Sequence, residues 1–187
     1  MKVRTLLFVL ALSCVCLFWL GCDVKAPPSD EIAQKLMTEF NLPKSSINVW
    51  GVEKADEYGA TYKVGIGKTD YLMKFRREAQ DWRWEQVKVG ENWMRYNDGR
   101  EAITYNLMRQ GLSDVTVALK NFLGTNNRYP SSLDELKNVS TRDAWGNAYV
   151  YEPQEDFSRY QLTCMGPDGK LGGGDDVSVN NLDEWSR

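Results

Sequence analysis

Two periodicities follow one another along this chain, and together they restrict its fold more than any other feature. Between residues 47 and 89, apolar and polar residues alternate in short runs such as Tyr62, Val64 and Ile66. Between residues 108 and 122, apolar residues recur at a 4-3-4-3 spacing. The first pattern is typical of strands with one buried face, and the second of an amphipathic helix. The sequence therefore predicts an α+β fold in which an antiparallel meander precedes a long helix.

Residues 30–95 are predicted to form the first of two modules. Ser29 is a candidate N-cap for a helix whose apolar residues Ile32, Leu36 and Phe40 lie on one face. An asparagine and a proline follow and end this helix. The strand-like segments are residues 47–52, 61–66, 71–75 and 82–89. One helix on an antiparallel sheet is the simplest architecture for this module.

Trp82 and Trp84 allow two interpretations. They could form an aromatic platform for a ligand, or they could fill a small core by cross-strand packing. Packing is favoured, because aromatic cross-strand pairs stabilise sheets.

A second module is predicted over residues 98–187, after a connector at 90–98. Asp98 is expected to cap its long helix, in which Gly111 costs up to about 1 kcal/mol relative to alanine. Residues 124–127 are expected to end the helix. The apolar seam of this helix, expected to face a core, consists of Met108, Leu112, Val115, Leu119 and Phe122.

Short elements are predicted beyond this helix. Ser132 and Glu135 form a capping-box pattern for a short helix. Two strands are expected over residues 148–152 and 159–164. The preceding Trp145-Gly146-Asn147 could line a ligand pocket or form a turn with an anchoring tryptophan, and the turn is favoured because Gly and Asn suit turns.

The N-terminal 22 residues have the character of an export signal. Lys2 and Arg4 precede an apolar run over residues 6–20, which ends in Gly21-Cys22. The run is short for a membrane span of about 20 residues. The segment resembles a bacterial lipoprotein box, which implies cleavage before Cys22 and lipidation of its thiol. Residues 23–29, with two prolines, are expected to be a short tether.

Two features qualify this interpretation of the N-terminus. Trp19 departs from the small aliphatic residue usual three places before the cysteine, and an uncleaved anchor helix is the alternative. By the pattern known from enteric bacteria, Asp23 after the cysteine favours retention at the inner membrane. The expected location is thus the bacterial cell envelope, facing the periplasm.

The cysteines and charges agree with an exported, lipid-anchored chain. Of four cysteines, Cys14 and Cys16 would leave with the signal and Cys22 would carry lipid, so Cys164 remains without an internal partner. Cys164 is expected to be a small buried residue on a strand. Removal of the signal leaves 21 basic and 26 acidic residues, a net charge of −5. This charge gives no reason to expect nucleic acid or anionic lipid as a partner.

From about residue 101 to the C-terminus, the chain resembles the C-terminal domain of the type II secretion major pseudopilin, general secretion pathway protein G. The matching elements occur in the family's order. They are the amphipathic helix, Asn127-Arg128-Tyr129-Pro130, Leu133-Asp134-Glu135-Leu136, Arg142-Asp143-Ala144-Trp145-Gly146-Asn147-Ala148-Tyr149, Gly166-Pro167-Asp168-Gly169 and Gly173-Gly174-Asp175-Asp176-Val177. The resemblance implies a pseudopilin-like fold, a calcium site, and secretion-system or pilus-like proteins as partners.

This chain departs from the family in two respects. Ala144 stands where the family usually has proline. The prepilin-peptidase site and the hydrophobic stem that packs pseudopilus subunits are replaced here by a lipoprotein signal and an extra module. The resemblance therefore implies a fold and a cation site more directly than assembly as a standard filament subunit.

The stretch MGPDGKLGGGDDV, residues 165–177, has two interpretations. Aspartate and glycine dominate ordinary solvated turns, and composition alone favours such a turn. Calcium needs six to eight oxygens at about 2.3–2.6 Å, which carboxylates and carbonyls of such a loop can supply. The spacing is not that of an EF-hand, and magnesium demands a tighter geometry.

The resemblance favours calcium in this loop. It implies carboxylate ligands from Asp168, Asp175 and Asp176. The candidate carbonyl donors are Leu162, Met165 and Leu171.

Histidine is absent, which removes histidine-based triads and zinc sites. No glycine stretch has the lysine-serine pair of a P-loop. Hydrolysis by a carboxylate pair remains open, although no pair stands out. The sequence favours a non-catalytic, lipid-anchored, calcium-binding interaction module, for which the resemblance implies a type II secretion or pilus-like machine as the setting. The alternative is a periplasmic ligand-binding lipoprotein unrelated to secretion.

Overall fold

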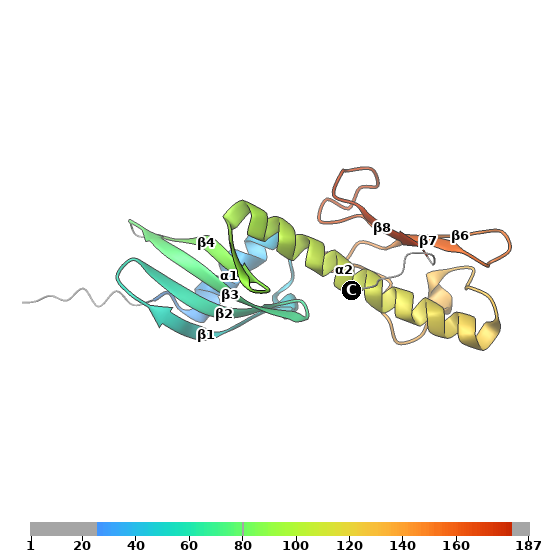
Figure 1. Ribbon diagram of the computed structural model, residues 1–187, viewed down its shortest axis with the longest axis horizontal. Coiled ribbons are helices and arrows are strands. Elements are labelled where there is room, and N and C mark those ends of the chain that lie inside the picture. Colours follow the sequence, from blue (N-terminus) through green and yellow to red (C-terminus); the bar gives the residue numbers. More distant parts are fainter. Residues whose placement is uncertain (1–25, 80, 181–187) are drawn as a thin grey trace, which may run out of the picture.

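The computed structural model describes residues 26–79 and 81–180. Its fold is α+β, as predicted, with a five-stranded and a three-stranded antiparallel sheet arranged along one long helix (Figure 1). The signal segment and Cys22 lie outside the described residues, so cleavage and lipidation stay predictions.

The five-stranded region begins with one helix and continues as a meander. Its elements are α1 (Ser29–Phe40), the 3-10 turn η1 (Lys44–Ser46), β1 (Ile47–Ala55), β2 (Gly59–Ile66), β3 (Thr69–Glu78), β4 (Asp81–Val89) and β5 (Asn92–Arg95). The strands pair in chain order from β1 to β5. The predicted meander is therefore present, with strands longer than expected and one strand more.

A single long helix, α2 (Tyr96–Asn126), leads from this sheet to the three-stranded region (Figure 1). The elements of that region are the 3-10 turn η2 (Leu133–Glu135), β6 (Val150–Pro153), β7 (Tyr160–Cys164) and β8 (Val177–Asn180). β7 is the middle strand of its sheet.

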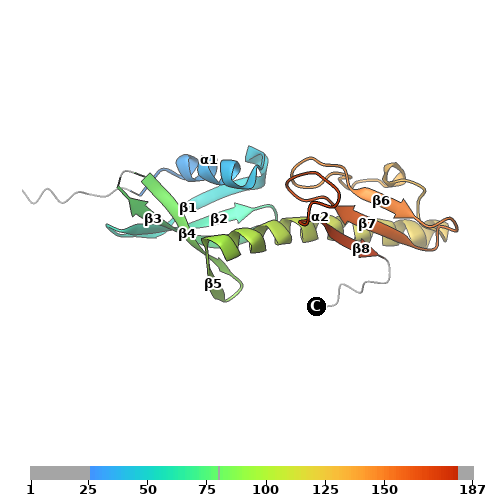
Figure 2. The ribbon, with the colours of Figure 1, turned by 90° about the horizontal axis from the view of Figure 1, so that it is seen from above.

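The first core lies on one face of the large sheet, where alternate residues of neighbouring strands point their side chains toward one another. Tyr62 lies opposite Met73, which in turn lies opposite Val87, and all three are fully buried. The helix α1 covers this face, above the strands in Figure 2. Trp82 and Trp84 are also buried in this core, so the packing interpretation of the pair is confirmed.

The long helix contributes side chains to both cores. Ile103 and Leu107 are buried with the five-stranded sheet. The predicted seam continues into the second core, where Met108, Leu112, Val115 and Leu119 are buried. The prediction is wrong for Phe122, which is half-buried outside this core, while its neighbour Leu123 packs against the core. The helix α2 thus spans both hydrophobic clusters. The division of the chain into modules at 30–95 and 98–187 stays a prediction.

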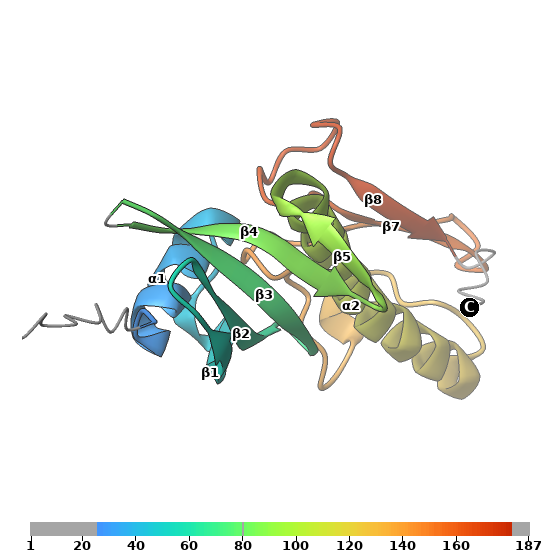
Figure 3. The same cartoon turned by 60° about the vertical axis from the view of Figure 1, so that its left-hand side comes forward.

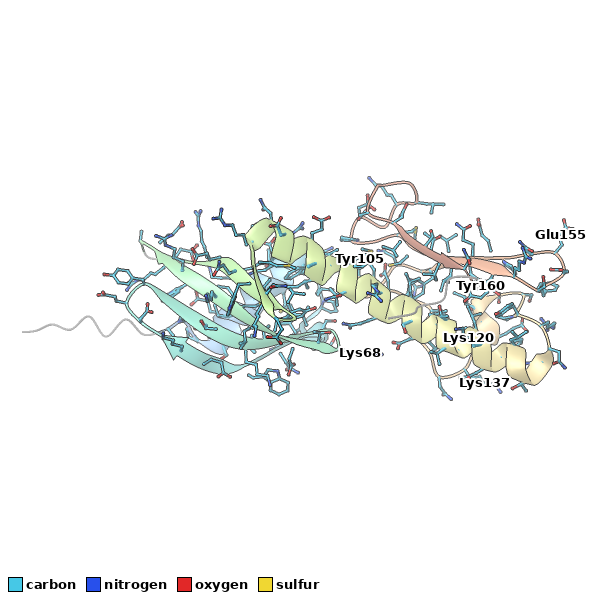
Figure 4. All side chains as sticks on the ribbon, in the orientation of Figure 1. Lys68, Tyr105, Lys120, Lys137, Glu155 and Tyr160 are labelled. Atoms are coloured by element: carbon cyan, nitrogen blue, oxygen red, sulfur yellow. The ribbon has the colours of Figure 1, made fainter. Side chains whose placement is uncertain are left out.

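Polar contacts also join the two regions. Lys68, in the turn after β2, pairs with Asp114 of α2, and its backbone N–H donates to the side chain of Gln110 at 2.9 Å. Figure 4 shows Lys68 at the end of the large sheet, beside α2. Trp145 donates its indole N–H to the carbonyl of Phe40 at 2.8 Å, which ties a loop of the three-stranded region to the end of α1.

Two predicted helix caps are wrong. Pro28, not Ser29, occupies the N-cap position of α1, because the Pro28 carbonyl accepts the bond from Ile32 N–H. Arg95, not Asp98, occupies the N-cap position of α2, because β5 leads directly into the helix and leaves Asp98 in its first turn.

Two strands were missed by sequence reasoning. β5 lies in the predicted connector, and β8 follows the glycine-rich stretch. Each has only four residues, too few to establish an alternation without knowledge of the pairing strand.

The capping box is present in altered form. Ser132 Oγ accepts from the N–H of Asp134, as expected of a cap, and the Glu135 carboxylate accepts from the N–H of Ser131 and also interacts with the backbone N–H of Ser132. The segment forms a 3-10 turn of three residues. Within the described part of the chain, no helix has the length and apolar character needed to cross a membrane.

Candidate functional site

The glycine-aspartate stretch forms the connection between β7 and β8. Its backbone folds back twice, where Gly169 N–H donates to the Gly166 carbonyl and Gly173 N–H donates to the Lys170 carbonyl. Gly166 has φ of 67°, in the left-handed region that favours glycine. The loop is therefore a series of tight turns, as the composition predicts.

Two of the three predicted carboxylates converge inside this loop. A methyl group added to Gly173 would lie 2.6 Å from Asp168 Oδ2 and 2.9 Å from Asp175 Oδ1. A methyl group on Gly166 would lie 2.6 Å from Asp175 Oδ2. Asp168 and Asp175 therefore approach the same glycine. A larger side chain at Gly173 would displace both carboxylates, and one at Gly166 would displace Asp175.

The third carboxylate, Asp176, is held at one oxygen and lacks a partner at the other. Its Oδ2 accepts the N–H of Gly172 at 2.5 Å. Its Oδ1 is buried without a hydrogen-bond partner among the described residues. A buried carboxylate oxygen without a donor is costly. A cation bound at Oδ1 would remove that cost, so this atom fits a metal ligand.

The predicted carbonyl donors lie at different places. Met165 begins the loop and Leu171, 62% exposed, lies near its middle. Leu162 lies in the centre of β7, where it pairs with Tyr151 and Val179 before the loop begins. The structure thus places Met165 and Leu171 in the loop, and Leu162 in the sheet beneath it.

The loop rests on a second turn, formed by residues 143–147. Asp143 Oδ1 accepts the backbone N–H groups of Trp145 and Asn147 at 3.0 and 2.8 Å. Asn147 Nδ2 donates to the Gly166 carbonyl at 3.0 Å. Asn147 therefore orients the start of the glycine loop, a contact between distant residues that sequence reasoning did not identify.

Trp145 anchors a turn of the chain. It is half-buried in this turn, and its indole N–H is used by the Phe40 carbonyl. The interpretation of residues 145–147 as a turn with an anchoring tryptophan is confirmed.

Cys164 lies at the end of β7 and is fully buried, as predicted, and it forms no disulfide within the described residues. Its thiol approaches Asp143 Oδ2 at 3.6 Å. Burial, with the nearby Asp143 and Asp176 carboxylates, raises the pKa of the Cys164 thiol to about 12. The thiol is therefore protonated near neutral pH and unsuited to nucleophilic chemistry.

The oxygen atoms of the loop can be compared with the ligands that a metal ion requires. No three Asp, Glu or Cys side chains within residues 26–79 and 81–180 are grouped as a ready-made metal site. Side-chain carboxylates alone would thus not enclose an ion here. Calcium accepts backbone carbonyls and water beside carboxylates. The convergence of Asp168 and Asp175 and the partnerless Asp176 Oδ1 fit such a mixed set.

Comparison with known families bears directly on this part of the chain. Residues 136–182 match the family model of type II secretion system (T2SS), protein G. The predicted resemblance of the C-terminal region is thereby confirmed over these residues, which follow η2 and include β6, β7, β8 and the glycine loop. The helix α2 and the five-stranded region lie outside the match. No curated protein and no solved structure matches the chain.

Proposed function

We propose that this protein is a lipid-anchored, calcium-binding and non-catalytic interaction module of the bacterial cell envelope, acting with a type II secretion or pilus-like assembly. The observation that carries the proposal is the match of residues 136–182 to type II secretion system protein G, because that segment contains the whole glycine loop. In this proposal the membrane is reached through lipid on Cys22, and Asp23 favours the inner membrane.

Calcium would be held by Asp168, Asp175 and Asp176 with carbonyls of the loop, including Met165 and Leu171. The ion would offset repulsion between carboxylates that converge near Gly173. Its role would be structural, since it would fix the loop and the start of β8 on the small sheet. The buried Cys164 and the absence of histidine agree with a protein that performs no reaction.

Calorimetric titration with calcium tests the site. The wild type is expected to release heat and to melt at a higher temperature with calcium, and Asp175→Ala to lose both effects. Asp134→Ala, which removes an exposed carboxylate of η2, is the control and should bind as the wild type does. The absence of calcium-dependent heat in the wild type, or an equal loss in the control, would contradict the site.

The assembly role is tested separately. Cross-linking of the lipidated protein in its own cell envelope is expected to recover secretion or pilus components, and Cys22→Ser to lose both lipid label and these partners. Repeated recovery of none of them would contradict the role in assembly while leaving the calcium site intact.

A further inference from the structure

The five-stranded sheet has a second face, the outer face, which points away from α1 and the first core. One row of paired residues across β2–β5 consists of Lys63, Leu72, Lys88 and Trp93. The next row, across β1–β5, consists of Lys54, Thr61, Lys74, Gln86 and Arg95. These residues alternate with buried ones such as Tyr62 and Met73, so their side chains lie on the opposite side of the sheet. Among the described residues no helix covers this face, and in Figure 3 the strands pass in front of α1.

Positive charge dominates the outer face. Its seven cationic residues are Lys54, Lys63, Lys74, Arg76, Arg83, Lys88 and Arg95. Four carboxylates pair with them, in the pairs Lys63–Asp70, Arg76–Glu85, Arg83–Glu78 and Lys88–Glu91. Within the described residues, Lys54, Lys74 and Arg95 form no ion pair. The outer face therefore keeps an excess of positive charge after every close carboxylate is counted.

Two exposed tryptophans lie among these cations. Trp93 is 38% exposed, and Lys74 Nζ lies 3.9 Å from the centre of its ring. Trp50 is 63% exposed and donates its indole N–H to Asp70 Oδ1 at 3.3 Å. Its indole lies over Gly65, where a methyl group would come within 3.4 Å of Nε1. Exposed tryptophan beside lysine and arginine is typical of protein surfaces that lie at a membrane interface.

A hollow of about 470 Å³ on this side of the sheet is lined by two of the lysines. Lys63 and Lys88 stand on either side of Leu72, which also lines the hollow. Asp70 belongs to the lining too, but its carboxylate is paired with Lys63 at 3.1 Å. The volume is in the range of small-ligand sites, about 300–1,000 Å³. Two ammonium groups beside an apolar residue suit a phosphate that carries an apolar substituent, as a phospholipid headgroup does.

The net charge of −5 expected for the exported chain conceals a separation of charge. Residues 59–95 contain eight Lys and Arg against five Asp and Glu, whereas residues 127–180 contain five against nine. The two regions pack on successive parts of α2, which has 31 residues and a length of about 46 Å. Charges are screened beyond a Debye length of about 8 Å at physiological ionic strength. The acidic region therefore does not cancel the attraction of the outer face for an anionic surface.

The start of the described chain is held close to the outer face. The Pro27 carbonyl accepts a hydrogen bond from the hydroxyl of Tyr62, the neighbour of Lys63 on β2. Both interpretations of the apolar run at residues 6–20, lipid on Cys22 and an uncleaved anchor helix, put the bilayer before residue 23. Residues 23–26 can span at most about 14 Å. A bilayer at the N-terminus is thus within reach of the sheet.

We propose that the outer face docks on a bilayer surface that contains anionic phospholipid, with Lys63 and Lys88 at a lipid phosphate and Trp50 and Trp93 at the level of the headgroups. This inference deepens the proposed membrane attachment and rests on it for the nearness of the bilayer. It does not depend on calcium. Docking would fix the direction of α2 relative to the membrane, and with it the place at which the three-stranded region meets a partner.

Lysine acetylation mapped by mass spectrometry on the full chain, reconstituted in vesicles, tests the docking. One set of vesicles contains phosphatidylcholine alone, and in the other about a third of the lipid is phosphatidylglycerol. Lys63, Lys74 and Lys88 are expected to react about fivefold more slowly on the anionic vesicles. High salt is expected to restore their rates, because it screens the attraction.

Lysines far from the outer face provide an internal reference. Lys120 and Lys137 are exposed in the three-stranded region (Figure 4) and should react equally on both kinds of vesicle.

Three double variants locate the site. Lys63→Glu with Lys88→Glu is expected to return Lys74 to its rate on neutral vesicles. Lys120→Glu with Lys137→Glu changes the net charge by the same amount and is the matched control, which should leave the protection of Lys74 unchanged. Lys63→Arg with Lys88→Arg keeps the charge and should keep the protection.

Flotation of the same vesicles separates attachment from docking. A chain that floats with both kinds of vesicle, but whose Lys74 reacts equally on both, would overturn docking and leave the attachment intact. A chain that floats with neither would overturn both. Loss of protection in the control variant would also contradict docking, as would protection of Lys74 without vesicles in a dimer seen by sedimentation, which would assign the face to a second copy of this chain.

Discussion

The two regions of this molecule achieve order by different means. In the five-stranded region, strands β1–β4 have eight to ten residues and fill one face of the sheet with aromatic and branched side chains. In the three-stranded region, strands have four or five residues, and much of the core comes from α2 and the loops. The first is organised by burial of alternating side chains, the second by turns that α2 supports.

The loop contacts show what this difference means. Asp143, Asn147 and Gly166 join two turns through side-chain and main-chain hydrogen bonds, and three aspartates follow in a loop of tight turns. Such a loop offers oxygens for a cation, which a sheet with paired backbone groups does not. The five-stranded region instead offers an open strand edge and a groove lined by both charged and apolar side chains.

Truncation of the two cores should produce the largest effects. Phe75→Ala in the five-stranded region is expected to cost about 3–5 kcal/mol, and Leu162→Ala in the three-stranded region about 2–5 kcal/mol. Because α2 contributes to both cores, both variants should shift one cooperative unfolding transition in denaturant. Val117→Ala, at an exposed site on α2, is the control with little effect. Two transitions, each moved by one variant only, would show that the regions unfold independently.

Two glycines of α2 should give the next largest effects, one for each region. A methyl group on Gly99 would lie 2.4 Å from Val87 Cγ1, inside the first core, and one on Gly111 would lie 2.0 Å from the Tyr149 hydroxyl. Gly99→Ala is expected to destabilise by about 1–3 kcal/mol, because Val87 is short, β-branched and fully buried. Gly111→Ala is expected to destabilise by less, because the Tyr149 hydroxyl ends a long side chain that can move aside.

Gly124 provides the control for this pair. A methyl group there meets nothing within 4 Å, so Gly124→Ala should stabilise by up to about 1 kcal/mol through helix propensity. Thermal melts rank the three variants. Stabilisation by Gly111→Ala, as propensity alone suggests, would show that Tyr149 does not restrict this position.

A pH dependence should appear in the three-stranded region. Burial raises the pKa of the Cys164 thiol from 9.0 to about 12, so the folded protein keeps a proton that the unfolded chain loses above pH 9. The contribution of this retained proton to the free energy of unfolding is fully present below pH 9 and is lost as pH rises toward 12. Relative to Cys164→Ala, the wild type is expected to lose about 1.4 kcal/mol between pH 8 and pH 10. Parallel curves for both proteins in denaturant titrations would contradict the shift.

The contact between the regions should give the smallest effect. Trp145→Phe removes the hydrogen bond to the Phe40 carbonyl and is expected to cost about 1 kcal/mol. Trp50→Phe, at a site 63% exposed, is the matched control and should cost less. Equal stability of the two variants would show that the indole bond does not hold the regions together.

Long periodic elements were predicted from the sequence in both regions, whereas short strands and the exact starts of helices were not. Alternation and helical spacing identified the meander, α1 and the seam of α2, because burial of one face leaves a periodic pattern. The four-residue strands β5 and β8 left no such pattern, and the caps assigned to Ser29 and Asp98 were wrong because neighbouring backbone decided where each helix began. The glycine loop was located correctly, while its calcium ligands stay a prediction.

The sequence by itself determined the fold class, the likeness of residues 136–182 to type II secretion system protein G, and the position of the aspartate loop, since each depends on local pattern. Tertiary structure alone decided that Asp168 and Asp175 converge on Gly173, that Asn147 holds the loop, and that the buried indole N–H of Trp84 has no acceptor among the described residues. These features depend on contacts between residues far apart in the chain. They also depend on which polar groups are left without a hydrogen-bond partner when the elements pack together.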